Sequence, residues 1–253
     1  MNPTIRRASA LASALAITAS VTACSRSESP ATPDGQTVAT SSTGTTPAPT
    51  TDTQPPKPAE IFDRAKSNAL AATSAVVTGE FDRDGATTKI SWQGAADGKT
   101  LDLRLTQHGL GNVHLIAVGG DVYLQADATG WKALGFAKLV QAAGDKFVKA
   151  PAASVGDLAQ SFSLRSLVEK SFGSLDASGL NGRVGSETVD GVDCWVLTGP
   201  SGAQNGALYV AKDSMQLVRI VGPKEKPLQL TFSQWGEELD IKAPPPDEVV
   251  GLK

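Results

Sequence analysis

The sequence predicts an α+β fold, in which a strongly curved antiparallel sheet of about ten strands wraps around a few α-helices as a half-barrel. Two observations carry this prediction. Apolar residues alternate with polar ones in two blocks, one before residue 126 and one after residue 182, which is typical of strands with one buried face. Dipeptides such as Asp97-Gly98 and Gly119-Gly120 separate the runs, and they favour the positive φ angles of hairpin turns.

Residues 1–23 have the layout of a lipoprotein signal peptide. Two arginines precede an Ala-rich apolar run, and Val21-Thr22-Ala23-Cys24 follows it in the pattern of a lipobox. We therefore expect Cys24 to be lipidated and to hold the chain on the extracytoplasmic face of the cell membrane. An ordinary signal peptide, a twin-arginine export signal and a spanning anchor are the alternatives, although the run is short against the roughly 20 residues that a span needs.

Residues 24–58 contain Cys24 and then mainly Ser, Thr, Pro, Ala and Gly. Such a segment buries too little apolar surface to offset the entropy of ordering, so we expect a disordered tether. The folded domain is expected over residues 59–250, a length typical of one domain. It opens with a helix over residues 60–70, in which Ile61, Phe62 and Ala65 share one apolar face.

The first block of alternating residues predicts five strands joined by short turns. In residues 101–106, three leucines alternate with Asp102, Arg104 and Thr106, so one face is apolar and the other faces water. Glycines 109 and 111 indicate a turn or bulge before the next strand. The expected strands cover residues 75–81, 88–93, 101–106, 113–118 and 122–125.

A helical middle separates the two blocks. One short helix is expected over residues 131–143, and one or two more over residues 155–172. The period of two then returns, with the Asp190-Gly191 turn between its first two strands. The expected strands of the second block cover residues 183–189, 194–197, 207–210, 217–221, 228–232 and 238–241.

The charge balance argues against a nucleic-acid partner. The formal net charge is −3, and it becomes −5 when the two arginines of the signal segment are removed, whereas a phosphate-binding face needs clustered Lys and Arg. The chain also has no nucleophile elbow, phosphate-binding loop or Cys-x-x-Cys motif. We therefore expect no enzyme activity and no cofactor.

The histidines and cysteines do not predict a reactive site. His108 and His114 are the two histidines, and no third ligand candidate lies near them in the sequence, so no metal site is expected. Cys194 lies in a strand-like run without a basic neighbour, which indicates a small buried hydrophobe. A Cys24–Cys194 disulfide is the alternative, and it would exclude lipidation.

The lipobox and residues 60–250 together resemble the LppX/LprG-type lipoproteins of mycobacteria and related actinobacteria, which share the half-barrel fold of the LolA/LolB lipoprotein carriers. The resemblance rests on Gly120-Asp121-Val122-Tyr123-Leu124 followed by Trp131, on Leu217-Val218-Arg219-Ile220, and on residues 230–236 through Ala243-Pro244. These are turns and core positions, so they indicate a fold more than an activity.

The resemblance implies a protein that binds the acyl chains of a lipid or lipoglycan in an apolar cavity and carries or chaperones them across the cell envelope. Its expected partners are the membrane, the lipid ligand and an envelope transporter, and we expect a monomer. By size and alternation, rather than by any family site, we expect the cavity to be lined by Trp92, Leu103, Leu105, Leu115, Phe162, Leu167, Trp195, Leu197 and Phe232. Plain core packing is the alternative for each, and a fully packed core would favour a non-catalytic anchored interaction or sensor module.

Overall fold

One large sheet dominates the computed structural model, which describes residues 55–83, 85–151, 160–173, 175, 179–180 and 182–251. The predicted signal peptide, Cys24, the tether as far as residue 54, and residues 155–159 of the expected second helical stretch lie outside these ranges. The strands are β1 (Ser74–Arg83), β2 (Ala86–Ala95), β3 (Leu101–Gln107), β4 (Gly111–Val118), β5 (Asp121–Ala126), β6 (Phe147–Pro151), β7 (Val184–Val189), β8 (Val192–Gly199), β9 (Gly202–Ala211), β10 (Leu217–Val221), β11 (Leu228–Ser233) and β12 (Val249–Gly251).

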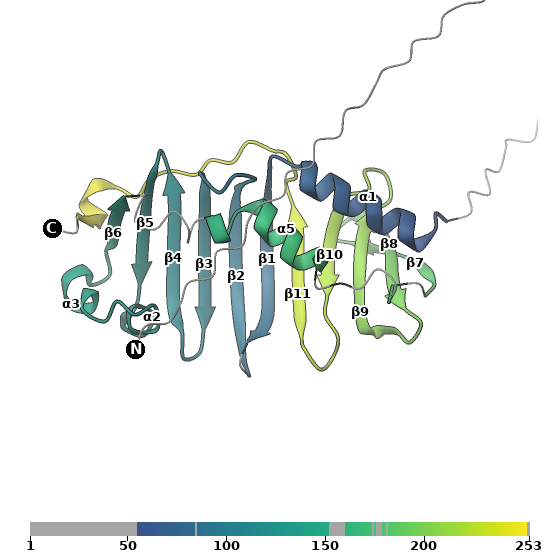
Figure 1. Ribbon diagram of the computed structural model, residues 1–253, viewed down its shortest axis with the longest axis horizontal. Helices are drawn as coiled ribbons and strands as arrows, with labels where there is room; N and C mark the ends of the chain where they lie inside the picture. The colour runs from purple at the N-terminus through teal and green to yellow at the C-terminus, as the bar shows by residue number, and fades with distance from the viewer. Residues whose placement is uncertain are drawn as a thin grey trace, which may run out of the picture. The chain divides into compact units, whose positions relative to one another are not determined.

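The sheet consists of two meanders that meet in its middle. The strand order is β12-β6-β5-β4-β3-β2-β1-β11-β10-β9-β8-β7, and β1 joins the two halves by pairing with both β2 and β11 (Figure 1). All neighbours are antiparallel except β12 and β6, and the curved sheet is not closed into a barrel. The predicted α+β fold with a curved antiparallel sheet is confirmed, although the sheet of the described residues has twelve strands rather than about ten.

The hairpin dipeptides form the turns that the sequence predicts. Asp190 and Gly191 both have positive φ, 50° and 84°, between the paired residues Val189 and Val192. Positive φ at both central residues matches the twist of the flanking strands, so the turn closes the hairpin without splaying it.

Four helices accompany the sheet in the described residues: α1 (Pro58–Ala71), α2 (Ala128–Ala133), α3 (Leu139–Ala143) and α5 (Leu164–Gly173). α1 and α5 lie over one face of the sheet, which we call the helix face (Figure 1). The rings of Phe62 in α1 and Phe172 in α5 meet edge to face, with centroids 5.3 Å apart. On the same face Trp92 of β2 is fully buried, and its Nε1 donates to the Phe162 carbonyl at 2.8 Å. None of the described helices is both long and apolar enough to cross a membrane.

The opposite, outer face carries its own apolar cluster under the C-terminal segment. Ile241 packs there with Ile116, Tyr123 and Phe147. The strand predicted at residues 238–241 is wrong, because this segment crosses the outer face and Ile241 N–H bonds back to the Leu239 carbonyl, as in a tight turn. The alternating apolar residues of this segment pack against the outer face of the sheet instead of pairing with a strand at its edge.

Three further differences from the sequence prediction have local causes. The single helix expected over residues 131–143 is divided into α2 and α3, because Gly135 adopts φ +82° and ends the first helix. β6 was not predicted, since Phe147-Val148 is followed by Lys149-Ala150-Pro151, which does not alternate. β12 was not predicted either, because it is only three residues long and pairs in parallel with a distant strand.

Candidate functional site

An apolar pocket lies on the helix face, where β1, β10 and β11 reach one rim of the sheet. Phe81, Ile220 and Leu228 line its centre. One lobe, of about 320 Å³, extends under Lys170 and Ser171 of α5. The other lobe, of about 500 Å³, extends toward β9. Both volumes are in the range of small-molecule sites, which run from about 300 to 1,000 Å³.

Strand register places the pocket wall. Phe81 of β1 stands directly opposite Leu228 of β11, and Ile220 of β10 stands opposite Leu230 of β11. Directly opposed residues point to the same face of a sheet, so these four side chains form one continuous apolar surface. Phe81, Leu228 and Leu230 are only half-buried. Part of this surface is therefore available to a ligand in the pocket.

The larger lobe also has polar residues in its lining. Asp82, Asn205 and Lys226 line it together with apolar residues that include Leu175 and Leu180. These three polar residues are exposed to solvent. The Asp82 carboxylate itself accepts the Thr87 hydroxyl at 3.0 Å on the outer face, so the polar side chains that the pocket offers are the Asn205 amide and the Lys226 ammonium group. The pocket thus joins an apolar interior to a polar, solvent-exposed edge, which suits a ligand with an apolar tail and a polar end.

The nine residues predicted to line a cavity all lie in or against the core on the helix face. Five of them are fully packed: Trp92, Leu103, Leu115, Leu197 and Phe232. The other four are half-buried and pack against that core: Leu105, Phe162, Leu167 and Trp195. The residues that line the rim pocket are different ones. Contact of the nine with a ligand therefore stays a prediction.

Sequence reasoning missed Phe81, Ile220 and Leu228, although it placed all three in expected strands. It favoured the bulkiest side chains and strand centres, whereas the pocket forms at the rim ends of β1, β10 and β11. The signal in the sequence was the alternation itself, since Phe81 and Leu228 occupy inward positions at the rim ends of their strands.

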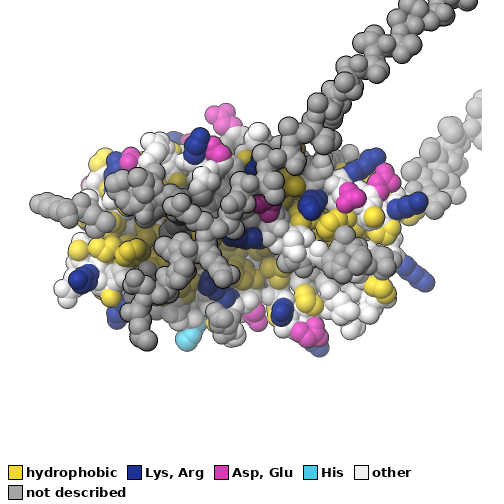
Figure 2. All heavy atoms as spheres, viewed as in Figure 1, with side chains coloured by type: hydrophobic (Ala, Val, Ile, Leu, Met, Phe, Trp, Pro, Cys, Tyr) yellow, Lys and Arg dark blue, Asp and Glu magenta, His cyan; other side chains and the backbone are white. Residues whose placement is uncertain are grey.

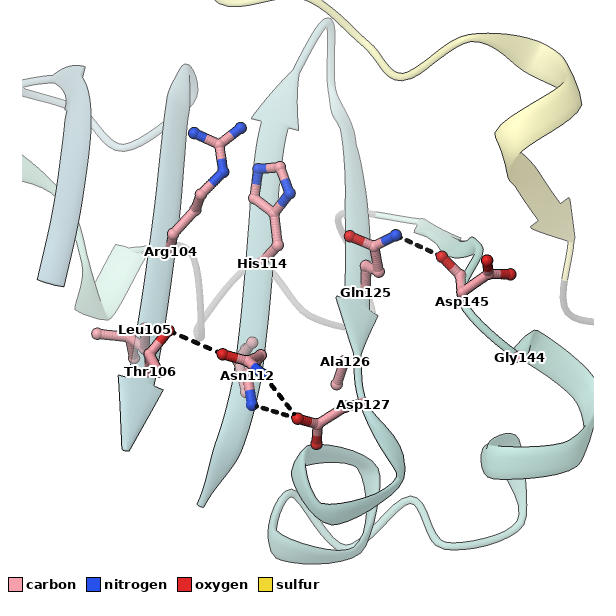
Figure 3. A pocket seen from close by; sticks show the side chains of 11 residues that line it. Arg104, Leu105, Thr106, Asn112, His114, Gln125, Ala126, Asp127, Gly144 and Asp145 are labelled. Carbon is pink, nitrogen blue, oxygen red and sulfur yellow. Dashed lines mark hydrogen bonds between the residues drawn. The ribbon is translucent and has the colours of Figure 1, made fainter. Parts of the chain in front are cut away.

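A second pocket, of about 420 Å³ and lined by both polar and apolar residues, lies on the outer face over β3, β4 and β5 (Figure 3). Arg104 and His114 project from neighbouring strands there, and both contact Asp102, at 3.4 Å for the Arg104 guanidinium and 2.9 Å for His114 Nε2. The ring of His114 also meets that of Phe147, with centroids 5.0 Å apart. These pairings satisfy one another and join the strands, so the cluster acts as a structural network. No group of three or more His, Cys, Asp or Glu able to hold a metal occurs among the described residues.

Asp127 closes this pocket at the start of α2. Its carboxylate accepts the Gly130 N–H at 2.8 Å. It also accepts the Asn112 backbone N–H at 2.8 Å and the Asn112 side-chain amide at 2.9 Å (Figure 3). The bond from Gly130 is the main cause that lowers the pKa of Asp127 below its ordinary value of 3.8.

We expect Asp127→Ala to lower the free energy of unfolding by about 1 kcal/mol at neutral pH, because it removes the N-cap of α2 and leaves the Asn112 N–H without its acceptor. The folded-state pKa is depressed, so this stabilisation is present above the unfolded pKa and is lost as the pH falls through the folded one. Urea denaturation of both proteins at neutral pH and at about pH 3 measures the difference, which should shrink in acid. The exposed Asp145→Ala is the control, and an equal loss in both variants would contradict the capping role.

Cys194 is the one cysteine in the described part of the chain, and it is free. It is fully buried on the outer face with Val189, Ala211 and Val218. Burial raises the pKa of the thiol, so it stays protonated at neutral pH. This environment suits a packing residue rather than a nucleophile.

Comparison with known proteins yields structural matches only. No protein-family model matches the chain, and no curated protein matches it by sequence. The structure is similar to LprF from Mycobacterium bovis, with TM-score 0.46 and 12% identity over 74% of this chain and 96% of that one. It is also similar to the lipoprotein LppX from Mycobacterium tuberculosis, with TM-score 0.45 and 16% identity over 73% of this chain and 98% of that one.

Proposed function

We propose that this chain is a lipid-binding protein of the cell envelope, which holds acyl chains in the rim pocket and carries or chaperones them while Cys24 anchors it to the membrane. One observation carries this proposal: an apolar pocket of about 500 Å³ opens at the rim of an unclosed sheet, and half-buried Phe81 and Leu228 form its wall. The pocket is lined chiefly by apolar residues, and the polar residues among them are exposed to solvent.

The energetics favour a hydrocarbon occupant. Each methylene group that leaves water contributes about 0.8 kcal/mol, so roughly ten buried methylenes gain about 8 kcal/mol before the ligand's ordering entropy is subtracted. An amphiphile can leave its headgroup beside Asn205 and Lys226 while its chain enters the apolar interior. Entry from the rim breaks no strand pairing, because β10 and β11 are joined there by a turn.

Leu228→Trp tests the proposal by filling the pocket. Leu228 lines both lobes, so a larger side chain there should reduce acyl-lipid binding roughly tenfold while leaving the fold intact. The measurement is displacement of a fluorescent fatty acid from the full chain, prepared without detergent and with Cys24→Ala so that every bound acyl chain is non-covalent. Native mass spectrometry of the same preparation identifies any lipid that co-purifies.

Gln229→Trp is the matched control, because Gln229 is the next residue along β11, is exposed, and points to the opposite face. It should bind the fatty acid as well as the parent chain does. A parent chain that co-purifies without lipid and takes up no fatty acid would refute the carrier function, and it would leave the anchored interaction module as the better description.

A further inference from the structure

The segment between β5 and β6, residues 128–143, exposes an aromatic side chain that nothing in the described structure covers. Phe136 is 45% exposed, and Val192, at 38%, is the other large apolar side chain that is exposed among the described residues. We call residues 128–143 the rim hairpin; it consists of α2, the Gly135 turn and α3.

Backbone geometry holds Phe136 at the tip of the rim hairpin. Gly135 adopts φ +82°, its N–H bonds to the Lys132 carbonyl at 3.1 Å, and the Phe136 N–H bonds to the Trp131 carbonyl at 2.8 Å. This is the bonding pattern of a Schellman motif, in which the residue in the position of Phe136 usually packs back against the helix. Here Trp131 is already fully buried in the core, and Phe136 stays exposed although its backbone is fixed.

The charges of the rim hairpin are of one sign. Lys132 and Lys138 are exposed on either side of Phe136, and residues 128–143 contain no Asp or Glu. Figure 2 shows hydrophobic and basic side chains close together at the end of the molecule where Figure 1 places α3. An exposed aromatic residue flanked by lysines is complementary to the interface of an anionic lipid bilayer, where the ring enters the headgroup region and the lysines meet lipid phosphates.

The rim hairpin and the apolar pocket occupy the same rim of the sheet. β5, which leads into the hairpin, runs in the same direction as β1 and β10, because neighbouring strands in this part of the sheet are antiparallel. The ends of β1 and β10 therefore lie on the rim that carries the hairpin (Figure 1). Val192 begins β8 after the β7–β8 turn and lies on the opposite rim.

We infer that the rim hairpin is a second membrane-contact site, which inserts Phe136 into the interface of an anionic bilayer and turns the pocket-bearing rim toward it. The occupant of this surface is the lipid bilayer itself rather than a cargo molecule. The contact does not require the pocket to bind lipid, so the two proposals can fail separately.

Site-specific fluorescence tests this inference on the full chain. With Cys24 and Cys194 replaced by Ala, an environment-sensitive fluorophore is attached through Phe136→Cys in one protein and through Val192→Cys in another. Each is mixed with phosphatidylcholine vesicles, either neutral or containing roughly 30% phosphatidylglycerol, with or without a quencher on the lipid chains. We expect the label at position 136 to shift to the blue and to be quenched on anionic vesicles at least about fivefold more than the label at position 192.

The lysines supply a second readout. Lys132→Ala with Lys138→Ala should raise the anionic lipid concentration needed for half-maximal quenching at position 136 roughly twentyfold, because each lysine near such a surface contributes a factor of about five. Lys99→Ala with Lys242→Ala, which lie away from the rim hairpin, should leave it unchanged.

Equal quenching at positions 136 and 192 would overturn the inference. So would quenching at position 136 that is the same on neutral and on anionic vesicles. So would a label at 136 that responds to an envelope protein fraction and not to vesicles, because the tip would then be a protein-docking surface. A chain that inserts at position 136 but binds no fatty acid would support the membrane contact and refute the carrier function. A chain that binds fatty acid but does not insert at position 136 would support the carrier function and refute the membrane contact.

Discussion

Gly79→Ala is expected to destabilise the protein by about 3–5 kcal/mol, because the change combines backbone strain with a steric clash at the centre of the sheet. Gly79 has φ +150°, which L side chains rarely adopt, and a Cβ built there would lie 1.9 Å from the Gln229 carbonyl oxygen. That oxygen belongs to the backbone of β11 and cannot rotate away. The pairing of β1 with β11 joins the two halves of the sheet, so the clash weakens the contact between those halves.

Thermal unfolding measures this effect, and the melting temperature should fall by about 10 °C or more. Gly185→Ala in β7 is the matched control, since φ at Gly185 is ordinary and the nearest atom to an added Cβ is 3.6 Å away. It should leave the melting temperature nearly unchanged. A Gly79→Ala protein as stable as the parent would mean that β1 and β11 do not approach each other as described.

Trp92→Ala has the second large expected effect, a loss of about 3–5 kcal/mol, because a fully buried indole would leave a cavity in the core. Val77 and Leu103 flank the ring on the neighbouring strands, and Gly94 leaves room for it, since a Cβ at Gly94 would lie 2.8 Å from the indole. The Nε1 bond to the Phe162 carbonyl also links the sheet to the segment before α5.

Two companion variants separate packing from hydrogen bonding at this position. Trp92→Phe keeps most of the volume but leaves the Phe162 carbonyl without its donor, so we expect a smaller loss of about 1–3 kcal/mol. Ser91→Ala, on the exposed face of the same strand, should cost less than about 0.5 kcal/mol. Urea denaturation gives all three values. A Trp92→Ala protein that keeps its stability but loses fatty-acid binding would contradict a core role and make Trp92 a cavity liner, as the sequence predicted.

The alternation of apolar residues determined much of the sheet from the sequence alone. Leu101, Leu103 and Leu105 face the helix side as the period of two requires, and the Asp190-Gly191 dipeptide closes the hairpin that it predicts. These features depend on neighbours close in sequence, so local chemistry is enough to specify them. Residues 238–241 show the limit of this reasoning, because the same alternation there serves to cover the outer face instead of forming a strand.

The sequence by itself therefore determined the fold class, the helix that opens the domain and most strands and turns, because backbone dihedral preferences and side-chain period are local properties. Only the tertiary structure decided which apolar residues border open space and which are packed. Trp92 and Phe81 look equally apolar in the sequence, yet the indole is fully buried and donates to the Phe162 carbonyl, while the phenyl ring is half-buried in the wall of the rim pocket. Burial of this kind depends on where helices distant in sequence come to rest on the sheet, and the pattern of one strand does not contain that information.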